Sequence, residues 1–236
     1  MRISMRILAI DSSGLVASVA LLEDNVMIAE YTMNYKKTHS QTLLPMLDQM
    51  MGIVECDPAS VDAIAVAAGP GSFTGLRIGS ATAKGLGLAL NKPIVPVPTL
   101  DAMAYNICVT DRVVCPVMDA RRNQVYTGVY AWEEDSFAVL EPQCAVAVDE
   151  IAARLNALGR PVIFLGDGVP VYREKLADLM EVPYTFAPPH MAMQRAGAVG
   201  VLGMKLLKLG HAEAAAAHQP EYLRMSQAER ERAERE

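Results

Sequence analysis

The chain has few cysteines and no arrangement of them that would build a zinc site or a disulfide framework. Its four cysteines, Cys56, Cys108, Cys115 and Cys144, are scattered and form no Cys-x-x-Cys motif. Scattered thiols fit the reducing cytosol. The sequence also lacks a basic region followed by an apolar core and a cleavage site, and no apolar run reaches the roughly 18 residues of a membrane span. These absences predict a cytoplasmic protein without a membrane partner.

An excess of positive charge is also missing. The 21 basic and 27 acidic residues give a net charge of −6, whereas a free-standing nucleic-acid binder usually carries a basic balance or patch. Hydrophobic residues make up 52% of the 236-residue chain and charged residues 20%, which excludes a disordered protein. This length permits one large or two small domains with a sizeable core.

Two halves of the chain show the same order of predicted elements. In the first half we expect strands at 5–10, 17–22, 26–35, 63–68 and 93–97, with helices at about 41–54, 73–90 and 99–108. In the second half we expect strands at 113–118, 124–132, 137–148, 162–165 and 183–187, with helices at 150–158, 172–180 and 191–209. Asp11 and Asp119 follow the first strand of each half. Duplicated βββαβα units predict two similar α/β lobes with a cleft between them.

The most unusual stretch of the sequence is a glycine turn followed by a helix of small residues. Gly69-Pro70-Gly71 separates an apolar strand from a helix that contains Gly75, Gly79, Gly85 and Gly87. Lys84 lies well inside this helix, so the turn is not a P-loop, and the glycine spacing does not match a dinucleotide fingerprint. Each interior glycine costs about 1 kcal/mol relative to alanine. The helix is therefore held by tertiary contacts, either with its own sheet alone or also with a partner.

Several motifs together resemble the TsaB (YeaZ) family of the glycoprotease-like proteins, nearly from end to end. The motifs are ILAIDSS at 7–13, HSQTLLP at 39–45, GPGSFTGLRIG at 69–79, AKGL at 83–86, MDARRNQVY at 118–126 and PEYLR at 220–224. The resemblance implies two RNase-H-like lobes of the ASKHA type, as in actin and sugar kinases. It places the partner-binding helices in an N-terminal lobe at 1–104. Residues 105–236 would then form the C-terminal lobe together with a charged C-terminal tail.

The resemblance also implies a function in tRNA processing. Members of this family are non-catalytic subunits that bind TsaD, the catalytic subunit, and act with the ATPase TsaE. The complex transfers a threonylcarbamoyl group to N6 of adenosine 37 in tRNAs that read ANN codons. ATP, metal and tRNA are then expected on the partner subunits or through the complex, so we expect no cofactor on this chain. A homodimer is expected when the chain is alone, and either Met1 or Met5 can be the start.

The resemblance places the partner interface on two helices. The bulky residues lie in the helix at 41–54 and the small ones in the helix at 73–90, a combination that suits close helix packing. The interface residues expected are Leu44, Leu47, Met51, Thr74, Gly75, Ile78, Gly79 and Thr82. A Gly79→Arg substitution is expected to abolish partner binding and leave the monomer folded.

Two enzymatic alternatives remain beside the scaffold. A stand-alone ASKHA-type phosphotransferase would bind nucleotide or phosphate through Asp11, Ser12 and Asp119, although each Asp can equally satisfy the turn after its strand. A glycoprotease-like metallopeptidase would need the histidine pair of TsaD, whose positions here hold Thr99 and Met103.

Three smaller features remain ambiguous in the sequence alone. His39 could act as a base, but it has no nucleophile motif beside it. Gly166-Asp167-Gly168 could approach an adenosine, and Arg121-Arg122 could contact tRNA phosphate or an acidic patch on a partner. Solvated surface charge explains the two arginines equally well. We expect no catalytic residue and no metal site on this chain.

Overall fold

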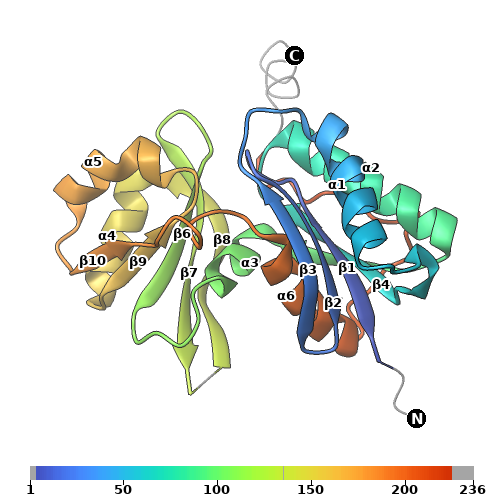
Figure 1. The fold of residues 1–236 in the computed structure, drawn as a ribbon. Coiled ribbons are helices and arrows are strands. Elements are labelled where there is room, and N and C mark those ends of the chain that lie inside the picture. Colours follow the sequence, from blue (N-terminus) through green and yellow to red (C-terminus); the bar gives the residue numbers. More distant parts are fainter. Residues whose placement is uncertain (1–3, 135, 225–236) are drawn as a thin grey trace.

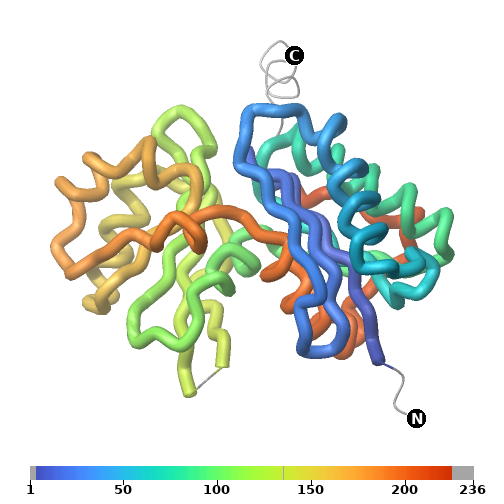
Figure 2. The backbone as a smooth tube through the Cα atoms, viewed as in Figure 1, coloured from blue at the N-terminus to red at the C-terminus, as the bar shows by residue number. Residues whose placement is uncertain are grey.

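The computed structural model describes residues 4–134 and 136–224, which form two lobes that are each built on a five-stranded sheet (Figure 1). The strand order is β3-β2-β1-β4-β5 in the first sheet and β10-β9-β6-β7-β8 in the second. The backbone trace shows the two sheets side by side, with the last helix of the chain back in the first lobe (Figure 2). The predicted charged tail at 226–236 and the question of Met1 lie outside the described residues.

The first lobe begins as a β-meander and continues with alternating helices and strands. β1 pairs antiparallel with β2 and parallel with β4, which places it at the centre of the sheet. The elements are β1 (Arg6–Asp11), β2 (Ala17–Glu23), β3 (Val26–Met33), α1 (His39–Ile53), β4 (Ala63–Gly69), α2 (Phe73–Leu90), β5 (Ile94–Pro98) and α3 (Thr99–Tyr105).

The second lobe repeats this pairing, which confirms the predicted duplication. β6 pairs antiparallel with β7 and parallel with β9, as β1 does with β2 and β4. The elements are β6 (Val113–Asp119), β7 (Gln124–Glu133), β8 (Ser136–Ala147), α4 (Val148–Leu158), β9 (Val162–Leu165), α5 (Val169–Leu179) and β10 (Tyr184–Phe186).

Helix α6 (Ala196–Lys208) differs from the sequence prediction in both its start and its place. The predicted helix began at 191, but residues 189–193 form turns, and the amide of Ala196 donates to the hydroxyl of Ser18 in β2. Val199 and Met204 pack with the first sheet, on the face opposite α1 and α2. The first lobe therefore includes α6 as well as most of 1–104, because the apolar side of α6 covers the otherwise open face of β1, β2 and β4.

Helix α3 joins the two lobes. Leu100 and Met103 pack into a core cluster with β6 and β9 of the second lobe. Asp101 accepts a hydrogen bond from the hydroxyl of Tyr130 in β7, at 2.8 Å. The hydroxyl of Thr99, the first residue of this helix, accepts a hydrogen bond from the buried amide of Gly69 at 3.1 Å. The lobes thus share a continuous apolar contact beneath their cleft.

Among the residues that the structure describes, no helix has the length and apolar character that crossing a membrane requires.

Candidate docking face and interlobe cleft

Helix α2 packs Gly75 and Gly79 against its own lobe. It begins at the Ser72 N-cap, whose hydroxyl accepts a hydrogen bond from the amide of Gly75. A Cβ atom on Gly75 would overlap the carbonyl oxygen of Ser12, and one on Gly79 would overlap the Ser12 hydroxyl. Ser12 in turn donates a hydrogen bond to the Gly75 carbonyl at 2.8 Å. These two glycines are needed because the turn after β1 lies directly against the helix.

The opposite side of α2 and the adjacent side of α1 form an exposed surface of small and apolar residues. Both helices cover the same face of the first sheet, so their exposed sides both point away from it (Figure 1). We call this surface the docking face and define it by Leu44, Pro45, Asp48, Gly52, Thr74, Ile78, Ala81, Thr82, Gly85 and Leu88. Within this set only Asp48 is charged. An exposed surface of this kind is typical of a site that another helix covers.

The structure divides the eight predicted interface residues into two groups. Leu44 is 51% exposed, and Thr74, Ile78 and Thr82 also reach the docking face. Leu47 and Met51 are only 5% and 4% exposed, because they belong to the core beneath α1. Gly75 and Gly79 are buried against Ser12. These four residues pack within the lobe itself, so the part of the predicted interface that the isolated chain exposes is Leu44, Thr74, Ile78 and Thr82.

The expectation for Gly79→Arg changes with this finding. An arginine at position 79 would displace Ser12, so the variant would lose stability rather than remain folded. A Cβ atom at Gly52 or Gly85, by contrast, would meet no heavy atom within 4 Å, and both glycines lie on the docking face. Gly85 is therefore the position where added bulk perturbs the docking face alone.

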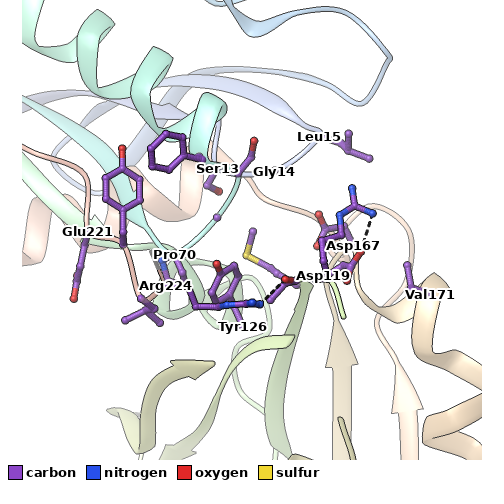
Figure 3. A pocket seen from close by; sticks show the side chains of 18 residues that line it. Ser13, Gly14, Leu15, Pro70, Asp119, Tyr126, Asp167, Val171, Glu221 and Arg224 are labelled. Carbon is purple, nitrogen blue, oxygen red and sulfur yellow. Dashed lines mark hydrogen bonds and ion pairs between the residues drawn. The ribbon is translucent and has the colours of Figure 1, made fainter. Parts of the chain in front are cut away.

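A cleft of about 440 Å³ lies between the two lobes (Figure 3). The turn after β1, the start of α2, the ends of β6 and β9, and the segment that follows residue 220 all contribute to its walls. Asp119 and Asp167 stand on the second-lobe side, opposite Pro70 and Glu221 (Figure 3). Polar and apolar residues both line this cleft.

The carboxyl groups on the second-lobe side are held by neighbouring polar groups. Asp119 forms a 3.2 Å ion pair with Arg121 and accepts a hydrogen bond from the hydroxyl of Tyr172 at 3.1 Å. Burial raises the pKa of Asp167 to about 6, and the charge of nearby Asp119 acts in the same direction. Burial, with the hydrogen bond to Asp119, also raises the pKa of Tyr172. Tyr172 had no signal in the sequence, because it lies 53 residues from its partner.

The predicted phosphate residues do not come together in this cleft. Asp119 lines it, but Asp11 is 1% exposed and accepts hydrogen bonds from the amide and hydroxyl of Ser13. Burial raises the pKa of Asp11 to about 6. Ser12 is also buried and occupied by its hydrogen bond to Gly75. The carboxyl that accompanies Asp119 is therefore that of Asp167, which belongs to the Gly166-Asp167-Gly168 turn.

The remaining sequence candidates have local roles. His39 lies with its Nε2 atom 2.8 Å from the Gly14 carbonyl, so this nitrogen carries a proton and donates. Arg121 pairs with Asp119, while Arg122 is exposed at the same turn. Across residues 4–134 and 136–224, no three His, Cys, Asp or Glu side chains are placed to hold a metal ion. Thr99 and Met103, which the family resemblance aligned with the TsaD histidines, are buried.

The duplicated lobes and the cleft between them define a protein of the ASKHA class, whose members share two RNase-H-like lobes. Two solved structures from Pseudomonas aeruginosa have this fold, one described as similar to peptidase YEAZ and one as YeaZ. They superpose with TM-scores of 0.79 and 0.76 at 26% identity, and cover 93% of this chain and 100% of theirs.

The sequence comparisons name the family. Residues 27–232 match the family model described as "TsaD: tRNA N6-adenosine threonylcarbamoyltransferase". The tRNA threonylcarbamoyladenosine biosynthesis protein TsaB of Bacillus subtilis is 34% identical over 95% of this chain and 96% of its own length. The protein of the same name from Escherichia coli is 34% identical over 70% of this chain and 72% of its own length. The chain belongs to the TsaB (YeaZ) family, as the sequence motifs predicted.

Proposed function

We propose that this chain is an accessory subunit in the biosynthesis of tRNA threonylcarbamoyladenosine, and that it binds a TsaD-type catalytic subunit through the docking face. The observation that carries the proposal is the exposed surface of small and apolar residues across α1 and α2. Its relatives are named for this pathway, and the matching family model describes the transferase itself. The partner would place its own helices on this face, because small side chains allow close approach of backbones.

The proposal assigns the chemistry to the partner subunit. The buried Asp11 and Ser12 leave this chain without the phosphate contacts of the first turn, and the positions of the TsaD histidines hold Thr99 and Met103. ATP and metal would then be bound by the partner and by a TsaE-type ATPase. The tRNA would be bound through the assembled complex, since this chain carries a net charge of −6.

The test is reconstitution of the reaction. The chain is mixed with its TsaD and TsaE counterparts, tRNA, threonine, bicarbonate, ATP and the enzyme that makes threonylcarbamoyl-AMP, and modified adenosine is measured by mass spectrometry. Product that depends on this chain supports the accessory function. Product that forms equally without it contradicts the proposal, and ATP turnover by the pure chain would favour the phosphotransferase instead.

The docking face is tested by a matched pair of variants. Gly85→Arg adds a bulky charge where the structure has open space, and Ala157→Arg adds the same side chain to the exposed side of α4 in the other lobe. We expect Gly85→Arg to lose partner binding and product, and Ala157→Arg to keep both. Sedimentation of the chain alone then shows whether the same face also binds a second copy, since Gly85→Arg would abolish that dimer too.

A further inference from the structure

The segment that follows α6 runs back across the first lobe and reaches the cleft. We call residues 213–224 the strap. It begins at the edge of the first sheet, where the backbones of Glu213 and Ile94 exchange two hydrogen bonds of 2.9 Å. Ala215 is then buried against Gly87 of α2, where a Cβ atom would lie 2.7 Å from the Ala215 side chain. The start of the strap is therefore fitted to both a strand and a helix.

A buried histidine holds the middle of the strap. His218 is 1% exposed, and its Nδ1 atom lies 2.7 Å from the carboxylate of Glu213. Since a carboxylate only accepts, Nδ1 carries the proton, and in the neutral imidazole Nε2 accepts from the Ser80 hydroxyl at 2.9 Å. The amine of Lys84 donates to the His218 carbonyl at 2.9 Å. The hydrogen bonds to Ser80 and Lys84 join this residue to two successive turns of α2, while the one to Glu213 stays within the strap.

The contact of His218 with α2 is structural rather than catalytic. Ser80, His218 and Glu213 are linked by hydrogen bonds in the same order as the serine, histidine and carboxylate of a hydrolase triad. Ser80, however, is 4% exposed, it lies within a helix, and it lines neither the interlobe cleft nor the shallow pocket beside α5. A nucleophile needs access to its substrate, so the arrangement is a closed hydrogen-bonded contact between α2 and the strap.

The far end of the strap forms a wall of the cleft and contacts both lobes. The amide of Glu221 donates to the Ala68 carbonyl at 2.7 Å, beside the end of β4. Tyr222 lies against Phe73 at the start of α2, with ring centroids 4.7 Å apart. Arg224 crosses to the second lobe, where its guanidinium donates to the Ala120 carbonyl at 2.7 Å. The labelled Glu221 and Arg224 stand on one side of the cleft in Figure 3.

We propose that the strap fixes the opening of the interlobe cleft, with His218 holding the strap on α2 and Arg224 joining it to the second lobe. The histidine holds the strap on α2, which sets the positions of Glu221 and Tyr222 in the cleft wall. Arg224 then joins this wall to the turn after β6. Loss of the histidine contact weakens the attachment of the strap to the first lobe, and loss of the Arg224 side chain removes its hydrogen bond to the second lobe.

Hydrogen exchange of the full chain tests the first step. In His218→Ala we expect the amides of Glu213 and Glu221 to exchange about tenfold faster or more, since a local opening becomes easier when buried hydrogen bonds are lost. His211→Ala is the matched control, because this histidine is exposed just before the strap and its loss should leave both amides protected. Unchanged protection of Glu221 in His218→Ala would overturn the proposal.

Distances between spin labels test the second step. Labels at Ala59→Cys and Ala157→Cys lie on exposed positions of the two lobes outside the docking face, in a chain whose exposed and half-buried cysteines are replaced by serine. We expect Arg224→Ala to broaden or lengthen the interlobe distance while the Glu221 amide stays protected. An unchanged distance distribution would refute the contact between lobes. Ser80→Ala, which removes a single hydrogen bond, gives the same exchange test if His218→Ala does not fold.

Discussion

Two glycines of α2 offer a direct test of how this helix is used, because the same substitution should have opposite effects at each. Gly75→Ala places a methyl group against the carbonyl oxygen of Ser12, whereas Gly85→Ala places it in open space on the docking face. Both positions lie in one helix of 18 residues, Gly75 in its first turn and Gly85 in its interior, and helix propensity favours alanine at each, so effects of opposite sign report tertiary contact.

The magnitudes follow from the contacts of each position. At Gly75, overpacking against backbone costs about 1–3 kcal/mol. Loss of the Ser12 hydrogen bond adds about 1 kcal/mol. The propensity gain of alanine over glycine offsets at most about 1 kcal/mol, which leaves a net loss of about 1–3 kcal/mol. At Gly85 only the propensity gain applies, so the free energy of unfolding should rise by roughly 0.5–1 kcal/mol.

Urea unfolding followed by circular dichroism measures both variants against the parent chain. We expect the midpoint to fall for Gly75→Ala and to rise slightly for Gly85→Ala, with similar slopes. Equal effects at the two positions would refute the assignment of buried and exposed sides to α2. A destabilised Gly85→Ala would show that this side of the helix is already covered in the isolated chain.

Three further predictions concern buried polar groups. Burial raises the pKa of Asp11 to about 6, above its unfolded value near 4. The contribution of this carboxyl group to the free energy of unfolding is therefore fully present below pH 4 and is lost as pH rises through about 6. Asp11→Asn should remove that loss and stabilise the chain at pH 8 by up to about 3 kcal/mol, as urea midpoints at pH 5 and pH 8 would show. Thr99→Val leaves the buried Gly69 amide without its acceptor and should lower the free energy of unfolding, measured in urea, by about 1–3 kcal/mol. Thr99→Ser keeps the hydroxyl and should retain most of that free energy. Tyr130→Phe removes the donor to Asp101 and should lower the melting temperature by several degrees, at about 2–4 °C per kcal/mol.

The sequence was sufficient to predict the duplicated architecture. Strands and helices of both lobes follow from apolar periodicity and turn residues, which are local signals. The start and place of α6 were not predictable in this way, because its position depends on a hydrogen bond to Ser18, which lies 178 residues away. Its apolar residues indicate a buried side, but they do not say which of the two sheets it covers.

The site residues were predictable only in part, for a related reason. A run of small residues shows that α2 is closely packed, yet it does not show which glycines meet the same chain. A Cβ atom on Gly75 or Gly79 would overlap Ser12, whereas one on Gly85 would lie in open space, yet all three positions are glycine in the sequence. Tyr172 and His218 were missed because each acts through partners that are distant in sequence.

The most direct measurement for the central claim is the affinity of this chain for its TsaD counterpart, measured by titration calorimetry for the parent, Gly85→Arg and Ala157→Arg. The account predicts that Gly85→Arg loses binding by at least about a hundredfold, as expected for a charge placed in a close-packed interface, and that Ala157→Arg binds like the parent. Thermal unfolding of each variant confirms that it is folded. Parent-like binding by a folded Gly85→Arg would contradict the assignment of the docking face.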